Sequence, residues 1–178
     1  SKVAAHPQVT AVAVDAQNPQ ALAEVLKGHD RVISAYNPGW SAPDIHDQYL
    51  KGASAIVEAA KAAHSWLLVV GGAGSLEIAP GVQLVDTPDF PAEWKQGALA
   101  ARDGLTALRR EAALDWRFVS PPVFLEPGEK RGGYRLGGDQ VLFSGDKPAG
   151  ITVGDLADAV INEAEKPAHL LQRFTLGY

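Results

Sequence analysis

The sequence predicts an α/β fold with a mostly parallel sheet and helices on both of its faces. Strand and helix patterns alternate along the first 120 residues, as they do in sheets of this kind. The continuous apolar run over 66–70 is also typical of a parallel strand that is buried on both faces. This run leads directly into Gly71-Gly72-Ala73-Gly74-Ser75, and ligands of open α/β sheets bind at such strand ends.

The first elements are predicted from local patterns. The valine-rich alternation over 9–14 favours a strand that stops at Asp15. Asn18 before Pro19 is typical of a helix start, because an Asn side chain caps a helix and proline suits its first turn. The elements expected are, in order, a strand over 9–14, a helix over 18–27, a strand over 31–36, a helix from 41 or 44 to 64, the strand over 66–70, a helix from 91 and a strand over 115–120.

Two long helices are predicted from their apolar stripes. In the first, the stripe consists of Tyr49, Ala53, Ile56, Val57 and Ala60. In the second, Leu99, Leu105 and Leu108 are expected to face the core, while the arginines at 102, 109 and 110 face outward.

The residues from 127 to 178 differ in composition from those before them: glycines are frequent, and the expected strands are short. We expect strands over 134–136 and 141–143, a helix over 153–165 and a last strand over 172–175. These residues are predicted to form a small lobe of the same domain, folded against the sheet. A chain of 178 residues with 46% hydrophobic content is sufficient for one core, so we expect a single domain over 1–178.

The composition excludes several classes of function. Without cysteine there is no disulfide, thiolate nucleophile or cysteine zinc site, and a net charge of −5 argues against a nucleic-acid partner. No run approaches the ~20 apolar residues of a membrane span, so we expect a soluble, cytoplasmic protein. The five histidines lack the spacing and the carboxylate neighbours of a metal site, and no metal is expected.

Small, polar or ring-shaped residues follow each of the four strands predicted in the first 120 residues. An acidic side chain at such an end can accept from a ribose hydroxyl, and small residues leave room for a sugar and a diphosphate. Each could also be an ordinary turn residue, but their occurrence at all four ends favours a dinucleotide site. The residues expected to contact the dinucleotide are Asp15, Ser34, Ala35, Tyr36, Gly71, Gly72, Ala73, Ser120, Pro121, Pro122 and Val123.

The same segments resemble the NAD(P)-binding atypical short-chain dehydrogenases. The resemblance is carried by Asp15, 32–35, Gly52-Ala53, 68–75 and 118–122, and it extends to the closing residues 172–178. Within that superfamily the sequence is nearest to the NAD(P)H-binding proteins labelled NADH-flavin reductases, close to biliverdin-reductase-B-like and NmrA-like proteins. The resemblance implies a Rossmann-like fold and an NAD(P)H cofactor.

One departure from the family concerns the phosphate site. The family's first βαβ unit, with its Gly-x-x-Gly-x-x-Gly turn, is expected to precede Ser1, and its two strands would lie between the strands over 9–14 and 31–36. We therefore expect an N-terminally incomplete chain, roughly 35 to 40 residues shorter than the intact protein. The choice between NADH and NADPH is usually set in that part of the fold.

A second departure concerns the catalytic acid. Trp94 and Ala98 stand where the Tyr-x-x-x-Lys pair of ordinary short-chain dehydrogenases is expected. Ser75 is the candidate to orient the acceptor. Lys95 is a second catalytic candidate, although a solvated lysine in a first helical turn is the plainer interpretation. Tyr36, Trp40 and Trp94 are candidates to contact a planar substrate, with packing against neighbouring residues as the alternative.

These observations predict an NAD(P)H-dependent oxidoreductase that transfers a hydride to a flavin (FMN or FAD), a quinone or a small carbonyl compound. The alternative, favoured by the missing Tyr and Lys, is an NmrA-like regulator that binds the dinucleotide without turning it over. Sugar epimerase or dehydratase chemistry is a third alternative, and the missing tyrosine argues against it. The expected partner is a small-molecule acceptor, and a homodimer is left open.

Overall fold

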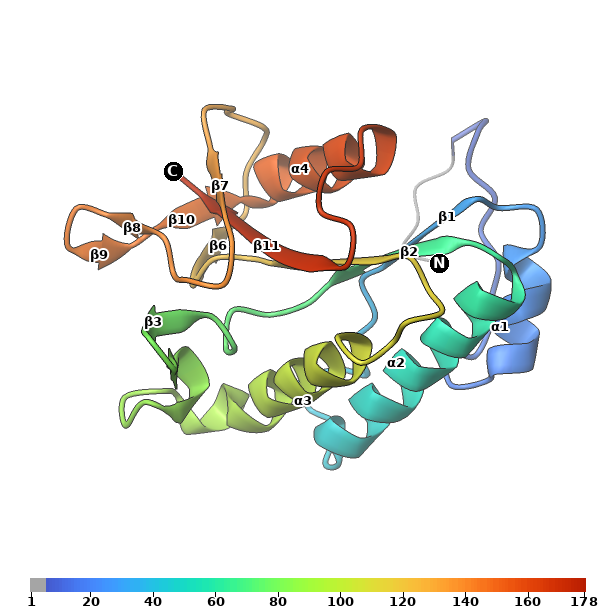
Figure 1. Ribbon diagram of the computed structural model, residues 1–178, viewed down its shortest axis with the longest axis horizontal. Helices are drawn as coiled ribbons and strands as arrows, with labels where there is room; N and C mark the ends of the chain where they lie inside the picture. Colours follow the sequence, from blue (N-terminus) through green and yellow to red (C-terminus); the bar gives the residue numbers. More distant parts are fainter. Residues whose placement is uncertain (1–5) are drawn as a thin grey trace.

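A five-stranded sheet with the strand order β1-β2-β5-β11-β7 organises the computed structural model, which describes residues 6–178 (Figure 1). Neighbouring strands run parallel except for the last pair. This arrangement confirms the predicted α/β fold with a mostly parallel sheet. The strands are β1 (Arg31–Ser34), β2 (Trp66–Val70), β5 (Trp116–Ser120), β11 (Gln172–Gly177) and the antiparallel β7 (Arg135–Gly137).

Helices cover both faces of this sheet. Leu67 and Phe118 belong to a core cluster with residues of α2 (Ile45–Ala62) and α3 (Ala92–Leu108). Leu68, the next residue along β2, packs instead with α4 (Val153–Glu165). Leu67, Leu68 and Phe118 are at most 1% exposed, and each such side chain contributes about 1.5–3 kcal/mol through burial. The apolar run over 66–70 therefore has the two-sided burial that was predicted.

The helix limits follow the capping signals. α1 (Pro19–Leu26) begins after Asn18, whose side chain accepts a hydrogen bond from the Ala21 amide at 3.0 Å. α1 packs beside α2. α4 occupies the predicted range, and the Thr152 hydroxyl caps it by accepting from the Asp155 amide at 3.1 Å. None of the helices within 6–178 is both long and apolar enough to cross a membrane.

The prediction of a strand over 9–14 is wrong. These residues form no strand, and Val9 and Val12 are 50% and 57% exposed. A valine-rich segment becomes a strand only where a neighbouring strand can pair with it. Within the described residues β1 pairs with β2 alone, and no strand lies beside 9–14.

The C-terminal residues differ from the predicted lobe because their last strand lies within the main sheet. β11 is inserted between β5 and β7, so it completes the core instead of lying against it. The strand expected at 141–143 is displaced to β8 (Phe143–Ser144). Strands of two or three residues are too short to give an alternating pattern, and the sequence missed β3 (Glu77–Ala79), β4 (Val82–Gln83), β6 (Phe124–Glu126), β9 (Lys147–Pro148) and β10 (Gly150–Thr152), with the short helix η1 (Leu84–Asp86).

Candidate functional site

The carboxyl ends of β1, β2 and β5 lie side by side at one edge of the sheet. Ser34 is paired with Val69, and Val70 with Val119, so the residues that follow these strands share that edge. This confirms that three of the four predicted strand ends gather there. They bring together Ser34-Ala35-Tyr36, Gly71-Gly72-Ala73 and Ser120-Pro121-Pro122-Val123.

Asp15 does not follow a strand. Its carboxylate accepts a hydrogen bond from the Gln17 amide at 2.9 Å, in the turn that precedes α1. The Gln17 side chain in turn donates to the Tyr36 hydroxyl at 3.4 Å, so this turn lies close to the end of β1. A ligand contact by Asp15 stays a prediction.

The glycines after β2 are required mainly by packing. A Cβ on Gly71 would lie 1.9 Å from the Phe118 ring, and one on Gly74 would lie 2.8 Å from the Ala98 Cβ. By contrast, the nearest atom to a Cβ on Gly72 would be 3.7 Å away. Gly72 and Ala73 are half-buried, so packing alone does not require glycine at Gly72, and a ligand contact there stays a prediction.

The residues that follow β5 are less accessible than predicted. Ser120, Pro121 and Pro122 are buried, and Val123 is half-buried. Their contact with a cofactor stays a prediction.

Ser75 is held by Arg173, a residue that the sequence reasoning missed. The Arg173 side chain on β11 is 2% exposed. Its guanidinium donates to the Ser75 hydroxyl at 3.2 Å and to the Ser120 hydroxyl at 3.3 Å. Because both hydroxyl oxygens accept from Arg173, their hydrogens are left to donate elsewhere. An arginine inside the otherwise apolar closing strand was the signal that could have indicated this role.

Asp139 is the charge partner of Arg173. The Arg173 Nε donates to the Asp139 carboxylate at 2.6 Å, and Arg109 approaches the same carboxylate at 2.6 Å. Burial acts to raise the pKa of Asp139, but the two guanidinium groups outweigh it and hold that pKa below its ordinary value. The loops after β2 and β5 are thus fixed to each other and to the loop after β7 through one ionised pair.

The aromatic candidates lie in different settings. The Tyr36 ring rests on α2, where a Cβ on Gly52 would lie 2.2 Å from it, and its hydroxyl donates to the Gln48 carbonyl at 3.2 Å. Trp40 is 63% exposed, yet its ring covers Gly97 on α3, where a Cβ would lie 2.6 Å from it. Trp94 is 53% exposed. Lys95 is exposed in the first turn of α3, so its catalytic role stays a prediction without support from local contacts.

Two histidines do have carboxylate neighbours, which corrects the expectation from sequence. His46 Nε2 lies 3.0 Å from Asp103, and Asp103 together with Asp47 raises the pKa of His46. His169 Nδ1 lies 2.8 Å from Glu163. Asp103 is 57 residues from His46, beyond the reach of a spacing argument. No group of three metal-ligating side chains occurs within residues 6–178.

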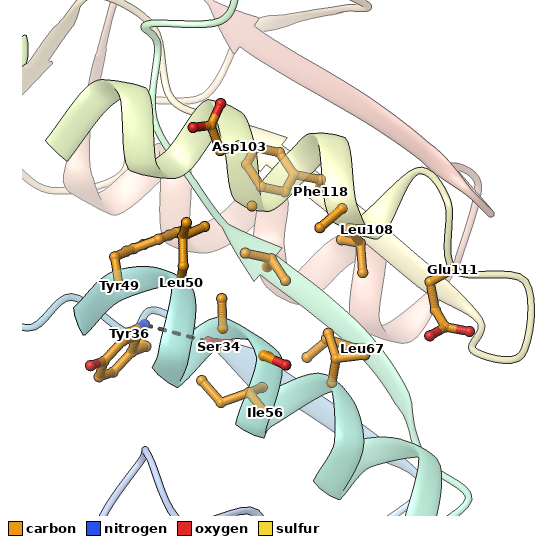
Figure 2. Close-up of a pocket in the computed structure, with 16 residues that line it drawn as sticks. Ser34, Tyr36, Tyr49, Leu50, Ile56, Leu67, Asp103, Leu108, Glu111 and Phe118 are labelled. Atoms are coloured by element: carbon orange, nitrogen blue, oxygen red, sulfur yellow. Dashed lines mark hydrogen bonds between the residues drawn. The ribbon is translucent and has the colours of Figure 1, made fainter. Parts of the chain in front are cut away.

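A cavity of about 420 Å³ lies between α2, α3 and one face of the sheet (Figure 2). Ser34 and Tyr36 from the end of β1 line it, and so do Val69 and Phe118. Phe118 is also the ring against which Gly71 packs. The cavity therefore shares Ser34 and Tyr36 with the edge where the strand ends meet, whereas Gly71 to Ala73 do not line it.

The chain matches known proteins over most of its length. A family model described as NAD(P)H-binding matches residues 1–167. The uncharacterized protein YwnB of Bacillus subtilis is 37% identical over 157 residues, which cover 86% of this chain and 73% of that protein.

Two solved structures have closely similar folds. A protein designated as exported, from Burkholderia pseudomallei, is 38% identical with a TM-score of 0.87 over 96% of this chain and 82% of that chain. A protein designated an NADH-flavin reductase, from Streptococcus pneumoniae, is 34% identical with a TM-score of 0.85 over 99% of this chain and 84% of that chain.

Proposed function

The chain belongs to the NAD(P)H-binding family, and from this membership we propose that it is an NAD(P)H-dependent oxidoreductase of the atypical short-chain dehydrogenase type. The acceptor is a flavin, a quinone or a small carbonyl compound. The observation that carries the proposal is the meeting of three parallel strand ends at one edge of the sheet, where small, half-buried residues follow β1 and β2 and buried ones follow β5. The designation of the Streptococcus pneumoniae relative supports a reductase. A cytoplasmic location is part of the same proposal.

The described residues fit a dinucleotide at this edge. Ser34 to Tyr36 and Gly71 to Ala73 would flank it, and Ser120 to Val123 would border the nicotinamide. Gly72 is half-buried, and a Cβ there would meet only Ala101, at an ordinary contact distance of 3.7 Å. When bound, the cofactor supplies a hydride.

The chain's own contribution is position and exclusion of water. Ser75 is 4% exposed and its hydroxyl oxygen accepts from Arg173, so it orients the acceptor molecule by holding the loop after β2 in place. Trp94 and Ala98 provide no acid in place of the usual Tyr and Lys. This favours acceptors such as flavins and quinones, which need little proton donation from the protein. The same absence favours the second candidate, a regulator that binds the dinucleotide without turning it over.

The test follows NAD(P)H absorbance with FMN, menadione and a small aldehyde. It uses the 178-residue chain and a version extended before Ser1 by the first βαβ unit of a relative. We expect oxidation by at least one acceptor, tighter NAD(P)H binding by the extended version, and a lower kcat for Ser75→Ala than for the exposed control Ser41→Ala. Tight binding without oxidation by any acceptor would exclude the enzyme and leave the regulator. Equal NAD(P)H affinity of the two versions would contradict the expected βαβ unit.

A further inference from the structure

The cavity between α2, α3 and the sheet has walls that suit a flat apolar ring. Three aromatic side chains line it, Tyr36, Tyr49 and Phe118, together with Leu67, Ile56 and Leu108 (Figure 2). Aromatic and aliphatic walls favour ring systems, which stack or pack edge-on against them. The lining residues with side-chain oxygens are Ser34, Tyr36, Tyr49 and Ser54, together with the carboxylates Asp103 and Glu111.

Its volume limits what can enter. At about 420 Å³ it lies in the lower part of the roughly 300–1,000 Å³ range of small-molecule sites. A pair of fused rings is well below this volume and fits with space to spare, whereas a whole dinucleotide exceeds it. The cavity is therefore separate from the cofactor's own position, although Ser34 and Tyr36 belong to both.

A second, independent observation concerns the hydroxyl of Tyr49. The residue is 7% exposed, but its hydroxyl oxygen is not among the fully buried side-chain atoms that lack a hydrogen-bond partner within 6–178, so this oxygen keeps accessible surface. The ring is wedged between helices, because a Cβ on Gly104 of α3 would lie 3.0 Å from it. Burial, with a smaller effect of Tyr36, raises the pKa of Tyr49 to about 12, so the hydroxyl stays protonated and can donate. An accessible tyrosine hydroxyl on the wall of a cavity can donate to a ligand oxygen.

We propose that this cavity binds the two-ring core of a flat, apolar, quinone-type acceptor, with the Tyr49 hydroxyl donating a hydrogen bond to one of its oxygens. That the bound molecule accepts a hydride rests on the proposed function, whereas its binding in the cavity does not. Tyr49 acts here as a binding and orienting residue and gives up no proton. The cavity shares Ser34 and Tyr36 with the edge proposed for the dinucleotide, so the bound ring system lies beside that edge.

The test measures Kd by calorimetry without cofactor, for menadione and for methylnaphthalene, which has the same rings and no oxygen. The chain has no cysteine to which the quinone could add. Tyr49→Phe is expected to weaken menadione binding about fivefold to tenfold, the effect of one hydrogen bond, and to leave methylnaphthalene within about twofold. An equal change for both ligands would overturn the assignment of the hydroxyl.

Variants that fill the cavity test its location. Ala53→Phe on α2 and Ala107→Phe on α3 both add a ring to the lining, so each is expected to weaken both ligands more than tenfold. Ala62→Phe, on the exposed end of α2, is the matched control and is expected to bind like the parent chain. Unchanged menadione affinity in both filled variants, or no saturable binding to the parent chain, would overturn the proposal.

The outcomes separate this inference from the proposed function. If menadione oxidises NAD(P)H equally well in the filled variants and the parent, the cavity assignment fails and the reductase stands. If menadione binds in the cavity while no acceptor oxidises NAD(P)H, the reductase fails and the binding site stands.

Discussion

Arg173 and Ser75 are 98 residues apart in the sequence, yet the Arg173 Nη1 donates to the Ser75 Oγ at 3.2 Å. The same guanidinium reaches Ser120 at the end of β5. One buried cation therefore sets the relative position of two of the three strand ends proposed to hold the cofactor. The site depends on the closing strand β11 as much as on the glycine cluster.

Replacing Arg173 with methionine should destabilise the fold. The change removes two hydroxyl hydrogen bonds and leaves Asp139 with Arg109 alone. Because the Asp139 side chain is 52% exposed and can be hydrated, we expect a loss of about 1–3 kcal/mol in the free energy of unfolding, below the usual effect of breaking a fully buried pair. Urea unfolding at neutral pH measures it.

The control for this change is Arg110→Met, which alters an exposed arginine in the turn after α3. It should stay within about 0.5 kcal/mol of the parent. Equal stability of the two variants would show that the Arg173 network does not support the strand ends.

Asp155 should make the free energy of unfolding depend on pH in the acidic range. Its carboxylate is buried and accepts from the Gly132 and Arg131 amides, from Thr152 and from the Tyr178 hydroxyl at 2.5 Å. Burial opposes ionisation, but these hydrogen bonds, that of Tyr178 foremost, lower the pKa of Asp155 to about 2.

A folded-state pKa below the unfolded value gives stability that is present above the unfolded pKa and is lost as the pH falls. The contribution of Asp155 should therefore be lost between about pH 4 and pH 2. Urea midpoints across that range should fall more steeply for the parent than for Asp155→Asn. Parallel curves would contradict the assignment.

Local signals in the sequence predicted the helices well. Asn18 and Pro19 define the start of α1, and the predicted range of α4 matches the structure, because capping and helical periodicity act within a few residues. The run over 66–70 was similarly sufficient to identify a buried strand.

Strand pairing and the site's long-range contacts could not be predicted in the same way. The segment 9–14 has a strand pattern but no described neighbour, and β11 joins the sheet beside a strand more than 50 residues earlier. Gly71 was interpreted as room for a ligand, whereas its packing partner is Phe118, a residue of another strand. Such contacts depend on the register of strands, which a single sequence pattern does not specify.

His46 should titrate above the ordinary histidine range. Asp103, and to a smaller extent Asp47, stabilises the charged ring and raises the pKa of His46 above 6.5. Because the folded-state pKa is raised, the stability from this contact is complete below the unfolded pKa and is lost as the pH rises through the folded one.

NMR titration of the His46 ring should therefore give a midpoint above 6.5 in the parent chain. Asp103→Asn should move that midpoint down toward 6.5, and Asp47→Asn should move it less. A larger shift in Asp47→Asn than in Asp103→Asn would show that the contact between α2 and α3 is not the dominant one.

Replacement by alanine should lower the free energy of unfolding at Gly71 and leave it nearly unchanged at Gly72. A methyl group on Gly71 would lie 1.9 Å from the Phe118 ring, so the strand end or the ring must move, and overpacking of this kind costs about 1–3 kcal/mol. Gly72→Ala meets its nearest atom at 3.7 Å and should leave the free energy of unfolding nearly unchanged. Urea unfolding of the two variants measures the difference.

The double variant Gly71→Ala with Phe118→Leu isolates the cause, because leucine removes the ring atoms that the new methyl group meets. If that contact is the reason for glycine at this position, the double variant should be more stable than the sum of the two single changes predicts, by more than about 0.5 kcal/mol. Additive losses would mean that Gly71 is required by its backbone or by a ligand instead. In that case the effect of Gly71→Ala should appear in NAD(P)H affinity. Otherwise we expect Gly72→Ala to have the larger effect on that affinity, since a methyl group at Gly72 causes no clash within the protein.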